Sequence, residues 1–172
     1  MEATEVLTQI LDHNKEMVEK AIDGLTDEEL SRRPTDHCNS IGWLLWHMAR
    51  AEDGLVSGVQ KSPELWTEQG WNEKFGMEPE DSGFQHKSEQ LAAFKAPPLD
   101  DLKAYWAATE QKARECLKSL RPEDLDRQVP SFIGEGTIPL VTFLNYLVHE
   151  AVVHGGQIAY LRGLHRGMGW YY

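Results

Sequence analysis

The chain has 172 residues, 41% of them hydrophobic and 26% charged, a balance that excludes disordered, collagen-like and low-complexity proteins. Its formal net charge of -11, with no compensating basic stripe, predicts that it does not bind nucleic acid. No run reaches the roughly 18 apolar residues of a membrane span, and residues 1–12 carry acidic side chains where a secretory signal is basic. The sequence therefore predicts a cytoplasmic protein without a membrane partner.

The first half of the chain contains two stretches with helical periodicity. Apolar residues recur at helical spacing over residues 6–25 and predict one amphipathic helix, whose apolar stripe is interrupted by Asn14. Residues 26–29 form a capping-box pattern that opens a short helical turn. A second long helix is predicted to end near Val59, with Asn39 or Ser40 as its N-cap.

The second half predicts two more long helices. Residues 62–83 form a long connection with short helical pieces and three aromatic side chains, and a third helix follows over residues 99–120. A fourth helix is expected over residues 139–162, with Thr137 as a capping residue and Gly163 as its C-cap. No alternating strand pattern of useful length is present. The expected fold is all-α: a four-helix bundle in a single domain over residues 1–172.

The fourth helix places two metal-ligating side chains on its apolar face. At about 100° per residue, Glu150 and His154 lie about 40° apart, whereas His149 lies about 100° away from His154. Their face also carries Phe143, Tyr146, Leu147, Gln157, Ile158 and Leu161. A buried carboxylate needs a cation, a hydrogen-bond network or a proton. The pair therefore predicts either a metal site or a Glu–His pair that a core residue such as Tyr146 satisfies.

A third ligand candidate lies on the second helix. His47 shares a face with mostly apolar or small residues: Trp43, Leu44, Ala51, Gly54 and Leu55. A lone histidine there is typical of a satisfied core residue, but three ligand types that converge in a bundle core are typical of a metal site. We therefore predict that His47, Glu150 and His154 bind one divalent metal ion.

The remaining histidines and the cysteines are weaker candidates. His86 and two other histidines lie in predicted loops, and a fourth lies at the border of the first helix, so we expect all of them to be solvated. Cys38 and Cys116 form no CxxC motif and lack the sequence signature of a catalytic nucleophile. We expect idle or buried thiols rather than a disulfide.

Two segments carry a family resemblance: residues 40–53 (SIGWLLWHMARAED) and residues 154–162 (HGGQIAYLR). They resemble the DinB-like, or YfiT-like, metal-dependent proteins, and the likeness covers nearly the whole chain. It implies a four-helix bundle in up-down-down-up order. The family triad commonly has one histidine on the second helix and two histidines four residues apart on the fourth. Here Glu150 occupies the position four residues before His154, so the triad becomes two histidines and a glutamate.

Two imidazoles and one carboxylate leave coordination positions open, which is typical of a catalytic site for zinc, and nickel or manganese would also fit. The resemblance implies transfer of a small-molecule thiol onto an electrophilic substrate, with the metal lowering the thiol pKa. One alternative is a hydrolase acting on an amide or ester through metal-bound hydroxide. Another is a non-catalytic, metal-stabilised bundle that dimerises or responds to stress.

An open metal site is useful only where a substrate can reach it. We therefore expect a pocket walled by aromatic residues of the second and fourth helices and of the long connection: Trp43, Tyr146, Trp66, Trp71 and Phe75. His149 and Gln157 are expected to support the ligands from outside. The alternative use of these aromatics is core packing or a homodimer interface.

Overall fold

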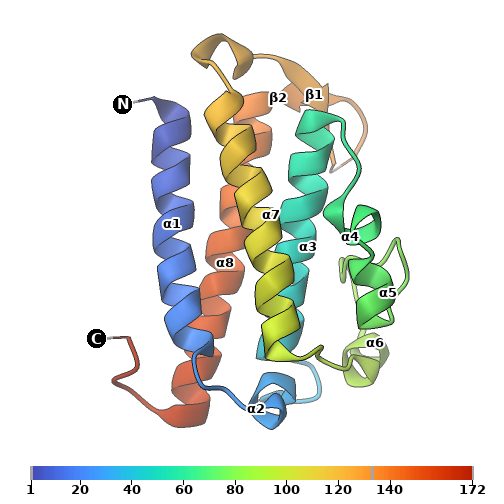
Figure 1. The fold of residues 1–172 in the computed structure, drawn as a ribbon, viewed down its shortest axis with the longest axis vertical. Helices are drawn as coiled ribbons and strands as arrows, with labels where there is room; N and C mark the ends of the chain where they lie inside the picture. The colour runs from blue at the N-terminus through green and yellow to red at the C-terminus, as the bar shows by residue number, and fades with distance from the viewer. Residues whose placement is uncertain (1, 133, 172) are drawn as a thin grey trace.

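The computed structural model describes residues 2–132 and 134–171, and this part of the chain is mostly helical. Figure 1 shows the long helices side by side, with shorter elements at the two ends and along one flank. In chain order the elements are α1 (Ala3–Ile22), α2 (Asp27–Ser31), α3 (Ile41–Gln60), α4 (Leu65–Glu68), α5 (Trp71–Phe75), α6 (Ser88–Ala93), α7 (Leu99–Ser119), η1 (Pro122–Asp124), β1 (Gln128–Pro130), β2 (Thr137–Pro139) and α8 (Leu140–Arg166).

Local sequence signals account for the helix starts. The predicted capping box is confirmed: the Thr26 hydroxyl accepts the backbone N–H of Glu29, and the Glu29 carboxylate accepts the N–H of Thr26 at 2.9 Å. Ser40 is the N-cap of α3, where its hydroxyl accepts the N–H of Trp43 at 3.2 Å. These caps satisfy N–H groups that have no partner inside a helix.

The four long helices, α1, α3, α7 and α8, enclose the hydrophobic core. One cluster of this core contains Trp46, Trp66 and Tyr105, each with an exposed fraction of 0%. A second cluster, which includes Leu117 and Leu144, occupies the end near the β-hairpin. Because burial of one large apolar side chain contributes about 1.5–3 kcal/mol, these clusters provide the main driving force for the bundle. None of the described helices is both long and apolar enough to cross a bilayer.

Three features of residues 128–166 differ from the expectations drawn from the sequence. Helix α8 continues through Gly163 to Arg166, because Arg166 donates to the Glu29 carboxylate (2.6 Å) and to the carbonyl of Gly24, which holds the last turn on the bundle. Thr137 lies in β2 and caps no helix. The strands β1 and β2 form an antiparallel hairpin, which the sequence pattern missed because each strand has only three residues.

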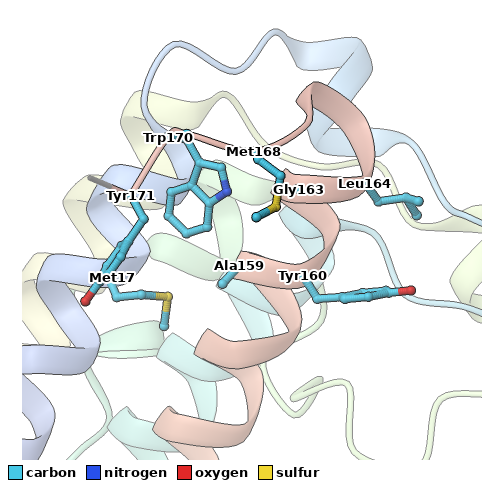
Figure 2. Close-up of a pocket in the computed structure, with 9 residues that line it drawn as sticks. Met17, Ala159, Tyr160, Gly163, Leu164, Met168, Trp170 and Tyr171 are labelled. Carbon is cyan, nitrogen blue, oxygen red and sulfur yellow. The ribbon is translucent and has the colours of Figure 1, made fainter.

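The segment after α8 folds back over the bundle. Trp170 packs against the core, and its ring lies 5.6 Å from that of Tyr171. Figure 2 shows both rings above an apolar hollow beside Met17 of α1, while Tyr160 of α8 points away from them. Trp170 therefore docks on the bundle.

Two carboxyl side chains of α3 lie inside the bundle. Asp53 is fully buried and accepts hydrogen bonds from the backbone N–H groups of Leu65 and Trp66 and from the Tyr105 hydroxyl. Glu52 is buried on the same helix and accepts the Thr109 hydroxyl at 2.7 Å. The hydrogen bonds of Asp53 attach α4 to α3, because a buried carboxylate needs hydrogen-bond donors and two of its donors are backbone N–H groups of α4.

Burial, reinforced by the neighbouring carboxylate of Glu110, raises the pKa of Glu52 to about 8. A raised pKa in the folded state favours the protonated carboxyl, so the stability from Glu52 is complete below pH 4.5 and is lost as pH rises through 8. We expect Glu52→Gln to raise the free energy of unfolding at pH 9 by a few kcal/mol and to have little effect at pH 4. Urea unfolding at both pH values measures this, with Glu16→Gln on an exposed position of α1 as the control. An equal effect of Glu52→Gln at both pH values would contradict the prediction.

Candidate metal centre

His47 is held in one orientation on α3. It is buried, with an exposed fraction of 7%, and the Trp43 ring stacks on its imidazole at a centroid distance of 4.7 Å. Its Nδ1 forms a hydrogen bond with the backbone carbonyl of Ser82. Because a carbonyl can only accept, Nδ1 carries the proton and Nε2 has a free lone pair.

The two candidates on α8 lie opposite this nitrogen. Glu150 Oε2 is 3.9 Å from Nε2 of His47 and 3.1 Å from Nε2 of His154. The Nδ1 atom of His154 is 2.8 Å from the side-chain oxygen of Gln157, which leaves Nε2 directed at the carboxylate. The structure therefore brings together the three residues that the sequence grouped.

The donor set has the chemistry and spacing of a site for a divalent metal. One ligand atom from each of His47, Glu150 and His154 lies within 4.8 Å of the others, and no other such group occurs in the described residues 2–132 and 134–171. In a tetrahedral zinc site with bonds of 2.0–2.2 Å, neighbouring ligand atoms are about 3.3–3.6 Å apart. The distances from Oε2 of Glu150 to the Nε2 atoms of His154 and His47, 3.1 and 3.9 Å, lie on either side of that range. Small side-chain rotations would therefore bring the ligand atoms to the spacing of a zinc site.

The electrostatics of the three groups are coupled. Burial lowers the pKa of His47, which favours the neutral imidazole that a metal requires. The hydrogen bond from His154 lowers the pKa of Glu150. Burial also acts to lower the pKa of His154, but the hydrogen bonds to Glu150 and Gln157 outweigh it and the pKa is raised. The carboxylate is thus ionised and partly compensated by its imidazole neighbours.

The loop between α5 and α6 surrounds His47. Gly83 is buried with φ +77°, and a Cβ atom there would lie 2.8 Å from Trp46, 2.9 Å from Trp43 and 3.0 Å from His47. The expectation that His86 is solvated was wrong. Its Nδ1 accepts the indole N–H of Trp43, and its Nε2 lies 3.0 Å from the Asp81 carboxylate. This network packs the loop against the helix that carries His47.

The two predicted supporting residues on α8 differ. Gln157 contacts His154 directly, as described above. His149 is exposed and does not belong to the cluster within the described part of the chain. The rotation of about 100° between His149 and His154 explains this difference, because the two side chains leave the helix in different directions.

A cavity of about 480 Å³ adjoins the cluster and includes His47 and Glu150 in its lining. Its apolar wall contains Phe143 of α8, Phe132 of the hairpin loop and Phe84 of the loop before α6. The side chains of Phe84 and Phe132 are exposed at 72% and 45%, so the cavity reaches the surface. The cavity therefore leads from the surface to His47 and Glu150 of the cluster.

The structure places the five predicted pocket aromatics in other contacts. Trp66, Trp71 and Phe75 pack on one another and on Tyr105. Trp66 is fully buried, and its backbone N–H donates to Asp53, which holds α4 against α3. Two further rings have other contacts: Trp43 stacks on His47, and Tyr146 meets the edge of Phe132 at 4.8 Å. None of the five predicted aromatics is among the residues that line the cavity.

A family model decides the relationship of this bundle to known proteins. The model of the DinB superfamily matches residues 10–158, a range that contains all three clustered residues. The chain belongs to the DinB superfamily. The resemblance carried by the motifs around His47 and His154 is thereby confirmed.

This DinB-superfamily chain is also similar to a solved structure, the crystal structure of a conserved protein of a locus from Enterococcus faecalis. The two share 28% sequence identity and superpose with a TM-score of 0.87 over 98% of this chain and 99% of the other. No curated protein matches the sequence. The likeness extends over nearly the full length of both chains and supports the fold.

Some parts of the site in this DinB-superfamily chain could not be predicted from the sequence. The acceptor for His47 is the backbone carbonyl of Ser82, which any residue could supply. Phe84 and Phe132 lie in different loops, 48 positions apart in the sequence (132 − 84), and no periodicity relates them. Gly83 is one of several glycine and proline residues in the connection over residues 62–83, and nothing in the sequence distinguishes it from the others.

Proposed function

We propose that this chain binds one divalent metal ion through His47, Glu150 and His154, and that it transfers a small-molecule thiol onto an electrophile. The observation that carries the proposal is the three-donor cluster beside a cavity that reaches the surface. A structural metal site is closed by four protein ligands, whereas three ligands with an accessible face are typical of a catalytic site. DinB-like proteins are metal-associated, which also supports the assignment.

The roles of the ligands follow from their hydrogen bonds. The Nε2 atoms of both histidines and Oε2 of Glu150 would hold the metal. The Ser82 carbonyl and the Gln157 side chain would orient the imidazoles by accepting their Nδ1–H groups. Such outer partners fix the tautomer and the direction of a metal-binding histidine, and their loss typically reduces metal affinity by about 10- to 100-fold.

The expected reaction joins sulfur to carbon. When bound, the metal would supply Lewis acidity that lowers the pKa of a thiol and raises the fraction of thiolate at neutral pH. The thiol proton leaves to solvent, the sulfur lone pair forms a bond to the electrophilic carbon, and the leaving group departs with its bonding electrons. Phe84, Phe132 and Phe143 would hold the apolar part of the electrophile and reduce the water near the reacting atoms.

The architecture is part of the same proposal. We assign one domain to residues 1–172, with the long helices in up-down-down-up order. The course of the chain in Figure 1 supports this order: α1 and α8 descend in the view, whereas α3 and α7 ascend. The connection through α4, α5 and α6 returns the chain to the end at which α7 begins, so α3 and α7 can run in the same direction.

A thiol-consumption assay tests the function. Protein loaded separately with zinc, nickel or manganese is mixed with 2-mercaptoethanol and 1-chloro-2,4-dinitrobenzene, and the thioether is followed by absorbance. We expect at least one metal form to exceed the metal-free protein more than about tenfold, because Lewis-acid stabilisation contributes several kcal/mol. His154→Ala should remove the increase.

Three results would point elsewhere. Hydrolysis of a nitrophenyl ester by the metal form, without thiol consumption, would replace the transferase with a hydrolase. A bound metal with neither activity, on a broad panel of thiols and electrophiles, would support a metal-stabilised bundle without catalysis. Absence of metal binding would overturn the site itself.

A further inference from the structure

A second groove lies away from the metal centre, between the later half of α1, the first half of α7 and the end of α8. Its volume is about 520 Å³, and none of its lining residues belongs to the cavity beside His47. Four basic side chains line it, against two acidic ones: Lys15, Lys20, Lys103 and Arg162, against Glu19 and Asp23. This excess of positive charge stands out in a chain whose formal net charge is -11.

Arg162 is the most informative of these residues. It lies on α8 with an exposed fraction of 9%, so nine-tenths of the residue is buried. The Nε and Nη1 atoms of Arg162 are buried and have no hydrogen-bond partner. Among the described residues, 2–132 and 134–171, none forms an ion pair with Arg162. Neither Glu19 nor Asp23 forms an ion pair with Arg162, although both line the same groove.

A buried guanidinium in this state is costly. Arginine keeps its charge at every physiological pH, so it cannot escape the cost of desolvation by losing a proton. Burial of a charge without a partner costs several kcal/mol, and buried polar groups in native proteins are almost always satisfied. Because Arg162 lines the groove, an anion bound there would supply the missing negative charge.

The other groove residues suit an anion with an apolar body. Lys103 forms no ion pair or hydrogen bond with the described residues, whereas Lys15 is already paired with Glu110. The half-buried indole ring of Trp170 provides apolar surface in the same groove, whereas Trp106 is buried and Lys15 lies over its ring. Arginine and lysine recognise carboxylate and phosphate groups, and indole rings pack on flat apolar groups.

We propose that this groove is a binding site for a small organic anion, whose carboxylate or phosphate group faces Arg162 and Lys103 while its flat apolar part packs on Trp170. The site is independent of the metal cluster, which shares none of its residues.

Calorimetric titration of the full chain tests the proposal with four probes: inorganic phosphate, phenyl phosphate, benzoate and uncharged benzamide. We expect phenyl phosphate or benzoate to bind more tightly than inorganic phosphate, and benzamide not to bind. Arg162→Gln should weaken binding about 10- to 100-fold, because hydrogen bonds to charged groups contribute about 1.5–3 kcal/mol. Comparison of phenyl phosphate with benzoate distinguishes the two kinds of anion.

The matched control is Arg121→Gln, which removes the same charge from an exposed position outside the groove and should leave binding unchanged. Lys103→Gln is a second variant that keeps the buried arginine, and it should weaken binding by a smaller factor. Thermal unfolding without probe adds a further readout: removal of an uncompensated buried charge should leave the Tm of Arg162→Gln equal to or above that of the wild type.

Two outcomes would overturn the site. One is that none of the anions binds the wild-type chain. The other is that Arg162→Gln and Lys103→Gln bind the anions as well as the wild type does. Equal binding of inorganic phosphate and phenyl phosphate would overturn the apolar part of the ligand. Metal content, measured on the same samples, should be unchanged in all three variants.

Discussion

Alanine at His47, Glu150 or His154 is expected to remove the bound metal, whereas alanine at His149 is expected to preserve it. Each of the first three side chains supplies one of the clustered ligand atoms. Loss of an outer partner alone reduces metal affinity about 10- to 100-fold, so loss of a ligand should reduce it by more than about 100-fold. Metal analysis after dialysis, with a competition titration for each variant, measures the change.

His149→Ala is the matched control, because it removes an imidazole one residue away from Glu150 without touching the cluster. Full metal content in the double variant of His47 and His154 would refute the proposed centre. Loss of metal in His149→Ala together with retention in Glu150→Ala would show that the wrong residue of α8 has been assigned.

Gly83→Ala is expected to reduce metal affinity about 10- to 100-fold, although position 83 supplies no ligand. The added Cβ would approach Trp46, Trp43 and His47 at 2.8–3.0 Å. These neighbours include two rings of the packed core, so the loop must move and carry the Ser82 carbonyl away from His47. Competition titration should show weaker metal binding, and thermal unfolding should show lower stability.

Gly76→Ala separates this effect from backbone strain. Gly76 has a similar φ of +66°, but apart from Gly76 and its two chain neighbours no described residue has a heavy atom within 4 Å of the position that its Cβ would occupy. A non-glycine residue at positive φ costs roughly 1–2 kcal/mol at either position. Gly76→Ala should therefore lose only this stability and keep its metal affinity. Equal metal affinity in the two variants would remove Gly83 from the support of the site.

The metal centre and the groove that contains Arg162 each include a feature that lowers the stability of the bundle. At the first, the three donors lie beside a cavity whose rim carries two exposed phenylalanines. At the second, the positive charge of Arg162 is retained in the interior without a partner among the described residues. Each arrangement costs stability unless a ligand is bound, because exposed apolar surface and unpaired buried charge are both unfavourable.

Helical periodicity in the sequence was sufficient to group the three candidate ligands. The spacing of about 100° per residue places Glu150 and His154 on one face and turns His149 away, and the structure agrees because α8 is continuous through this region. The apolar neighbours of His47 likewise predicted an inward-facing imidazole, and His47 is buried. Such predictions succeed because they depend on one regular helix at a time.

Contacts between elements distant in the sequence could be decided only by the tertiary structure. The carbonyl of Ser82 reaches His47 across 35 positions of the sequence, and a backbone acceptor carries no side-chain signature. Trp66, expected as a pocket wall, is instead core, because Asp53 accepts backbone N–H groups of α4 and holds this short helix against α3. Nothing in the sequence distinguishes Arg162 from other residues near a helix end, and its burial depends on how the other elements pack around α8. Periodicity specifies which way a side chain leaves its helix, whereas the partner that it meets depends on how all the helices pack.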